Sequence, residues 1–268
     1  MRSERSIQFI LIFIITFAVW TNSYLAGDYF DKGEVSQGVI HITYKGTTGK
    51  RAKVIIEKGD KKYTYDINSQ GKKESFPLQL GNGTYKVKIL ENTMGNSYRI
   101  ADSQTIEVKL KDGNIAFLNA TQNINWTVDM KAVKKAVDLT KGTKDLQEKA
   151  KMLYSYVACN YAYDYKKLAT LPSTYLPVID ATLLEKKGIC YDFSSLYAAM
   201  LRSQGVPAKL VKGYTPNAEG YHAWNEVYDS SKKEWVIIDT TYDLQVIKIK
   251  PKTKMIKSEK EYQKVNEY

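Results

Sequence analysis

The residues best suited to chemistry are a cysteine, a histidine and an aspartate that follow one another along the chain. Cys190 is followed by His222 and then by Asp239, in a sequence with only two cysteines and two histidines. A thiol attacks well only as the thiolate, so it needs a base beside it and a third group that orients the base. This order therefore predicts a thiol nucleophile with its own base and orienting carboxylate.

A helix is expected to carry the cysteine. Gly188 precedes Cys190, and Gly205 and Pro207 end the stretch that follows. Apolar residues recur there at helical spacing: Phe193, Leu196, Tyr197, Met200 and Leu201. Cys190 is thus predicted in the first turn of an amphipathic helix, where free N–H groups and the helix dipole favour an anion. The same N–H groups can hold a developing oxyanion.

A hairpin is expected to carry the other two residues. Residues 221–228 and 234–240 have strand character, and the turn-rich segment 229–233 separates them. A turn centred between Ser230 and Ser231 pairs Trp224 with Ile237 and places His222 directly opposite Asp239. Directly opposed residues have Cβ atoms about 4.5–5.5 Å apart, close enough for a Cys–His–Asp relay.

Three segments together resemble the transglutaminase-like superfamily, a group of papain-like folds that includes animal transglutaminases, bacterial cysteine peptidases and peptide N-glycanases. They are residues 188–192, 221–227 and 235–241, within a region of resemblance over roughly 140–245. The resemblance implies an α+β core, with the nucleophile on a helix N-terminus packed against an antiparallel sheet. It makes Cys190 the nucleophile, His222 the general base and acid, and Asp239 the orienting carboxylate.

The segment 160–164 also resembles the Tyr-x-Tyr-Asp stretch that precedes the cysteine in bacterial members of the superfamily. In some relatives an aromatic donor from that region helps to hold the oxyanion, which makes Tyr163 the candidate here.

Two other interpretations of Cys190 stay open: a structural cysteine, or one half of a disulfide with Cys159. Cys159 follows a predicted helix over 146–157 and falls on the side away from its apolar stripe, as a packed or half-exposed thiol.

The N-terminus predicts export. Arg2 and Arg5 precede an apolar run over residues 7–20, which is the pattern of a secretory signal. The run is shorter than the ~20 residues that span a bilayer comfortably. Residues 1–26 are therefore expected to be a signal peptide or an uncleaved membrane anchor. The protein is expected to be bacterial, and secreted or anchored at the outer face of the cell.

The region between this segment and the cysteine has a different pattern of apolar and polar residues. Within residues 33–125, short runs alternate apolar and polar positions between turn signals: 39–44, 52–57, 62–67, 85–90 and 105–110. They predict a small all-β sandwich of immunoglobulin-like type, acting as a spacer or a binding module. The catalytic domain is then expected over 126–246 and a lysine-rich extension over 247–268. In that extension we expect a strand near 246–249 and a helix over 258–268.

The net charge of +11 suits anionic cell-wall polymers or lipid headgroups, although a solvated lysine-rich tail explains it equally well. Export and the lack of a recognisable module argue against nucleic-acid binding. No segment has the spacing of a metal site or a phosphate-binding loop, so we expect no metal and no cofactor. The sequence gives no indication of oligomeric state.

These patterns favour an enzyme that forms an acyl-enzyme on peptide or side-chain amides. Water as the acceptor gives a peptidase or amidase, and an amine gives a crosslinking transglutaminase. The expected partner is a protein or peptide substrate, possibly one associated with the cell wall. The alternatives are a catalytically silent binding or cell-surface scaffold protein that keeps the fold, and a structural wall protein.

Overall fold

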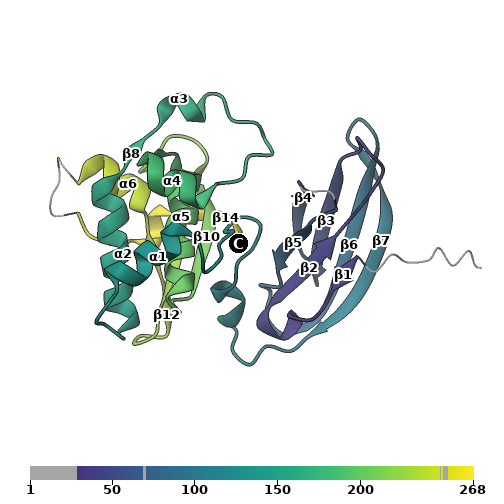
Figure 1. Ribbon diagram of the computed structural model, residues 1–268, viewed down its shortest axis with the longest axis horizontal. Coiled ribbons are helices and arrows are strands. Elements are labelled where there is room, and N and C mark those ends of the chain that lie inside the picture. Colours follow the sequence, from purple (N-terminus) through teal and green to yellow (C-terminus); the bar gives the residue numbers. More distant parts are fainter. Residues whose placement is uncertain (1–28, 69–70, 248, 250–252) are drawn as a thin grey trace, which may run out of the picture.

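The chain has two halves of different texture, which lie side by side with the C-terminus between them (Figure 1). The computed structural model describes residues 29–268 except 69–70, 248 and 250–252. The predicted signal or anchor over 1–26 lies outside the described residues. Among the helices that are described, none is long and apolar enough to cross a bilayer.

The N-terminal half consists of two antiparallel sheets around a shared core. One sheet has the strand order β1 (Phe30–Asp31), β2 (Val39–Thr43), β5 (Lys73–Pro77). The other has the order β4 (Lys61–Ile67), β3 (Ala52–Lys58), β6 (Gly83–Met94), β7 (Ser97–Val108). Alternate side chains such as Val54 and Ile56 are buried against Ile40 and Phe76 of the other sheet. This half is all-β, as expected, while its immunoglobulin-like type stays a prediction.

Helix α5 (Cys190–Ser203) is the centre of the second half. The remaining helical segments of the described chain are η1 (Val35–Gln37), η2 (Ile115–Leu118), α1 (Lys131–Leu139), α2 (Leu146–Asn160), α3 (Tyr165–Leu168), α4 (Ile179–Glu185), α6 (Thr240–Val246) and η3 (Glu259–Glu261). Helices α1, α2, α4 and α6 all contact α5, which also packs on the sheet. Every residue from Cys190 to Arg202 is buried, so the predicted amphipathic helix has no solvent face. Some of its polar side chains have partners inside the protein: the Ser195 hydroxyl, for example, donates to the Asn123 carbonyl oxygen at 2.9 Å.

A five-stranded antiparallel sheet supports α5. Its order is β13 (Ile256–Lys257), β12 (Glu234–Ile238), β11 (His222–Asp229), β10 (Ala208–Tyr214), β14 (Gln263–Glu267). One face, with Leu210 and Val227, joins the core around α5, and the other carries Trp224 and Tyr262. A short parallel pair, β8 (Ala162–Tyr163) and β9 (Lys187–Gly188), lies at the start of α5. The α+β class is confirmed.

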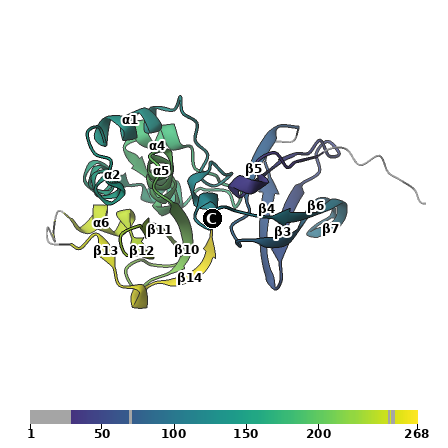
Figure 2. The same ribbon diagram turned by 90° about the horizontal axis from the view of Figure 1, so that it is seen from below.

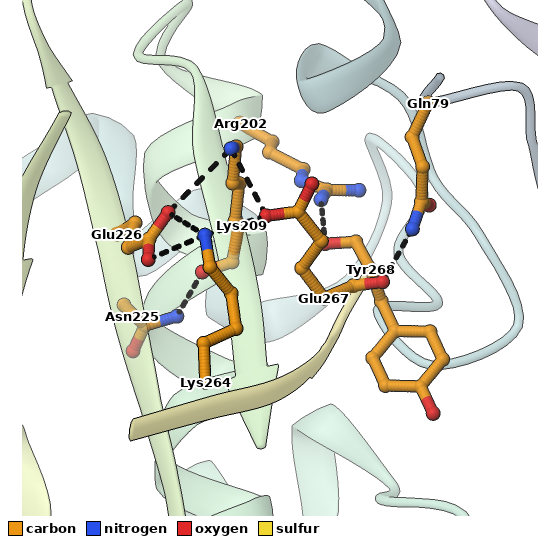
Figure 3. Close-up of polar contacts among 8 residues, drawn as sticks. All are labelled: Gln79, Arg202, Lys209, Asn225, Glu226, Lys264, Glu267 and Tyr268. Carbon is orange, nitrogen blue, oxygen red and sulfur yellow. Dashed lines mark hydrogen bonds and ion pairs between the residues drawn. The ribbon is translucent and has the colours of Figure 1, made fainter. Parts of the chain in front are cut away.

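The C-terminal segment differs from its prediction. Val246 ends α6, so the described residues of 246–249 form no strand, and the helix expected over 258–268 is replaced by η3 and strand β14. Strand β14 pairs with the edge of β10, and Lys264 and Glu267 form ion pairs with Glu226 and Lys209 (Figure 3). Lysine and glutamate favour a helix in isolation, but here the unpaired edge of β10 supplies stronger main-chain partners.

These residues therefore complete the sheet instead of forming a separate extension. They also connect the two halves, because Gln79 of the N-terminal half donates to the Glu267 carbonyl oxygen (Figure 3). Figure 2 shows β14 along the outer edge of the sheet, ending between the halves.

Candidate active site

Cys190 is the first residue of α5, and it is buried with 8% of its surface exposed. The turn that presents it is fixed by Asp192, whose carboxylate accepts the Ile189 N–H group at 2.9 Å. The same carboxylate binds Lys167 Nζ at 2.7 Å and accepts the Tyr175 hydroxyl. Asp192 is completely buried, so these three partners replace its lost hydration. They tie the loop after β8 to the turn that carries the thiol.

His222 and Asp239 are adjacent, but not by the predicted register. Strand β11 pairs Asn225 with Ile238 and Tyr228 with Trp235, a shift of two residues from the expected pairing. The turn is centred between Ser231 and Lys232, one residue later than predicted, because Asp229 ends β11 and accepts Ser231 N–H at 3.0 Å, and Lys233 adopts a φ of 58°. A shift of two keeps every side chain on its face, whereas a shift of one would have separated the pair.

The chain leaves β12 at Ile238, and Asp239 becomes the N-cap of α6. Its Oδ1 accepts the Tyr242 N–H at 2.9 Å, while its Oδ2 accepts His222 Nε2 at 2.9 Å and the Tyr262 hydroxyl at 3.0 Å. Asp239 is fully buried. Three donors thus fix this carboxylate in one orientation, and a helix cap holds it in place.

The Cys190 thiol is the other group near His222, and Nδ1 is the ring nitrogen that the contact with Asp239 leaves free to face it. Burial opposes the charged imidazolium, but the hydrogen bond to Asp239 and the nearby Cys190 side chain outweigh it and raise the pKa of His222 to about 10. At neutral pH the site therefore favours a protonated imidazole beside the sulfur. An adjacent positive charge is one of the settings that stabilise a thiolate.

Tyr163 lies in β8 opposite Gly188, and its hydroxyl interacts with the Cys190 side chain and backbone N–H. Burial and the nearby thiol raise the pKa of Tyr163, which keeps its hydroxyl protonated and able to donate. The structure thus brings all four candidate residues, Cys190, His222, Asp239 and Tyr163, to the N-terminus of one helix.

The structure tests the interpretation that Cys159 and Cys190 form a disulfide. Cys159 and Cys190 are both free thiols, with Cys159 exposed, so the disulfide interpretation is wrong. Across the part of the chain that the structure describes, no group of three or more His, Cys, Asp or Glu side chains is arranged to hold a metal ion.

Sequence reasoning missed two residues of the site. Asp192 lies three residues after Ile189, so a carboxylate at this position of a predicted helix was the available signal for a cap. Tyr262 gave no signal, because it lies in the lysine-rich segment far from the hairpin and reaches Asp239 only through the fold. Together these residues surround the Cys190 thiol with an imidazole that Asp239 orients and with hydrogen-bond donors at a helix terminus. This is a setting for attack on a carbonyl carbon.

Part of the chain is similar to known proteins. Residues 133–240 match the family model of the transglutaminase-like superfamily. The uncharacterized protein YebA of Bacillus subtilis is 26% identical over 162 residues, which are 54% of this chain and 22% of that protein. The chain therefore spans only a small part of the length of this relative.

Two solved structures are similar to this chain at low TM-scores. A candidate cysteine protease from Cytophaga hutchinsonii gives a TM-score of 0.45 at 17% identity, covering 86% of this chain and 76% of that chain. The periplasmic domain of TgpA from Pseudomonas aeruginosa gives a TM-score of 0.40 at 15% identity, covering 82% and 93%. Because these TM-scores are low, they carry no argument about the family. The similarity to the transglutaminase-like superfamily is the sequence match over residues 133–240.

Proposed function

We propose that this protein is an exported thiol enzyme that acts on peptide or side-chain amides. One observation carries the proposal: Cys190 begins a buried helix with His222 as its neighbour, and His222 is hydrogen-bonded to Asp239 at 2.9 Å. Each member has the chemical character that its role requires, namely a thiol, an imidazole that carries a proton, and a carboxylate fixed by three donors.

In the first half-reaction the Cys190 thiolate attacks the amide carbonyl carbon, and the carbonyl electrons move to oxygen. The Tyr163 hydroxyl and the N–H groups of the first turn of α5 are the donors available to this oxyanion. The His222 imidazolium then gives its proton to the leaving nitrogen. The C–N bond breaks, an amine departs, and a thioester on Cys190 remains.

In the second half-reaction neutral His222 removes a proton from the acceptor as it attacks the thioester, and the thiol is restored. Water gives hydrolysis and an amine gives transfer, and the residues of the triad serve both. Export is proposed from the N-terminal basic and apolar pattern, and the net charge of +11 favours substrates at an anionic cell wall.

The test begins with the thiol itself. Iodoacetamide labelling of the full chain across pH compares the wild type with His222→Ala, and Cys159→Ser removes the exposed second thiol. We expect rapid labelling of Cys190 below pH 7 that depends on His222. Slow labelling that His222→Ala leaves unchanged would refute the proposal.

Activity is then sought in a library of peptide amides, with and without an added primary amine, using Cys190→Ala as the inactive control. Product release without amine indicates hydrolysis, and incorporation of the amine indicates transfer. A reactive Cys190 that turns over no amide would instead support the silent scaffold.

A further inference from the structure

A cavity of about 140 Å³ lies beside the first turn of α5, between the two halves of the chain. The N-terminal half contributes Tyr65 to its lining, and the second half contributes Tyr191, Lys212 and Tyr268. Tyr191 directly follows Cys190 in sequence, and Lys212 is near enough to Cys190 for the thiol to affect its pKa, so the cavity lies in the neighbourhood of the thiol. The triad itself does not line it, which raises the question of what the cavity holds.

Lys212 is the cationic residue of this lining. Its Nζ lies 3.5 Å from the centroid of the Tyr191 ring and 5.4 Å from that of Tyr268. No carboxylate among the described residues forms an ion pair with it, whereas the lysines of the neighbouring sheet edge, Lys209 and Lys264, are both paired. Burial lowers the pKa of Lys212 to about 8, against the opposing effect of Cys190, so the ammonium form still dominates at pH 7. An ammonium without a counter-ion in a half-buried position is costly unless an anion joins it.

Tyr65 adds a second unsatisfied group. It is 4% exposed, and its hydroxyl has no hydrogen-bond partner among the residues that the structure describes. Burial raises the pKa of Tyr65, so this hydroxyl remains a neutral donor. Asn123 contributes the opposite chemistry, because its Nδ2 donates to the Tyr191 hydroxyl at 2.7 Å while its Oδ1 has no partner. Such orphaned buried groups are rare in proteins and often mark a missing ligand or water.

The acidic residue of the lining does not neutralise Lys212. Asp66 forms its ion pair with Lys53, on the neighbouring strand β3. The cavity thus offers an ammonium and a phenolic donor for an anion, and an amide oxygen for an N–H group.

We propose that this cavity binds a substrate carboxylate that lies next to the attacked amide, with Lys212 and Tyr65 as its cation and donor. The inference rests on the proposed function, because it places the substrate on Cys190. The cavity holds about four or five waters at ~30 Å³ each, which is room enough for a carboxylate group. The carboxylate has two sources, an acidic side chain or the terminal carboxylate of a peptide.

Equilibrium binding to the full chain carrying Cys190→Ala tests this without any need for activity. The probes are acetyl-Gln-Glu-amide, the neutral acetyl-Gln-Gln-amide, and acetyl-Gln-Gly with either a free or an amidated C-terminus. We expect one carboxylate probe to bind about tenfold more tightly than its neutral partner, the size of a hydrogen bond to a charged group. Whichever pair shows the preference identifies the source.

Added substitutions assign the preference to the cavity. Lys212→Met is expected to abolish it, Lys212→Arg to retain part of it, and Tyr65→Phe to reduce it about threefold. The matched control is Lys109→Met, which removes an exposed lysine that does not line the cavity and should leave the preference intact. Equal binding of charged and neutral probes, or a preference that survives Lys212→Met, overturns the inference.

The two proposals fail separately. A reactive Cys190 without any carboxylate preference overturns the cavity assignment and leaves the thiol chemistry in place. An unreactive Cys190 with a Lys212-dependent preference overturns the proposed enzyme and leaves an anion-binding cavity.

Discussion

Replacing Asp239 by asparagine should separate the charge of this side chain from its structural role. Asparagine keeps the N-cap, because its side-chain oxygen can still accept the Tyr242 N–H of α6. Its amide nitrogen would then face His222 Nε2, where it donates and so favours the neutral ring. The fold is preserved while the imidazolium loses its anionic partner.

The structure sets the size of the effect. His222 has a pKa of about 10 against an ordinary 6.5, which corresponds to roughly 5 kcal/mol in favour of the imidazolium. Asp239 and Cys190 share this stabilisation, and a hydrogen bond to a charged group contributes about 1.5–3 kcal/mol. Losing on the order of 2 kcal/mol should weaken the Cys190 thiolate–imidazolium pair about thirtyfold relative to the neutral thiol and imidazole, which sets the upper limit for the slowing of alkylation at pH 6.

The assay is the rate of iodoacetamide alkylation of Cys190 between pH 5 and 10, in a Cys159→Ser background. Wild type should react rapidly near pH 6, and Asp239→Asn should approach the wild-type rate only at high pH. Because the folded pKa of His222 exceeds its unfolded value, the stabilisation it gives is full below pH 6.5 and is lost as pH rises towards 10. The unfolding free energies of the two proteins should therefore converge at high pH. Superimposable alkylation profiles would refute the reasoning.

Three further substitutions test the supports of the site. Tyr262→Phe removes one donor to the triad carboxylate, so it should lower the free energy of unfolding in urea by about 1 kcal/mol and slow alkylation at pH 6 severalfold. No change in either quantity would contradict this. Asp192→Ala leaves Lys167 without its partner and should cost about 3 kcal/mol, measured by urea unfolding against Lys109→Met as a control. Gly213→Ala places a Cβ 2.0 Å from the Gln263 carbonyl oxygen, so β14 should lose protection in amide hydrogen exchange while the N-terminal half keeps it.

Local patterns predicted the elements of the site well. Helix α5 begins at Cys190 as expected, because a glycine before it and a glycine and proline after it bound the apolar repeat. The triad residues came together despite a wrong register, because side chains on a strand alternate with a period of two. The position of the hairpin turn could not be predicted from the sequence, since it depends on the Asp229 cap and on the left-handed conformation of Lys233.

Local sequence patterns could not predict the contacts between distant segments. The segment 258–268 is rich in residues that favour helices, and only the free edge of β10 makes it a strand. The same holds for Tyr262, which reaches Asp239 from a loop with no apolar period, and for Lys212, one of the two lysines of strand β10. Tertiary contacts override weak local preference in each case.

The position of β14 in the chain has a consequence for biosynthesis. The ribosome releases the N-terminus first, so Cys190, His222 and Asp239 are all made before Tyr262 and β14. Until those later residues arrive, β10 has an unpaired edge and the triad carboxylate lacks one of its donors. The nascent chain therefore carries the reactive residues without their complete surroundings, and full reactivity of the thiol follows the docking of the last strand.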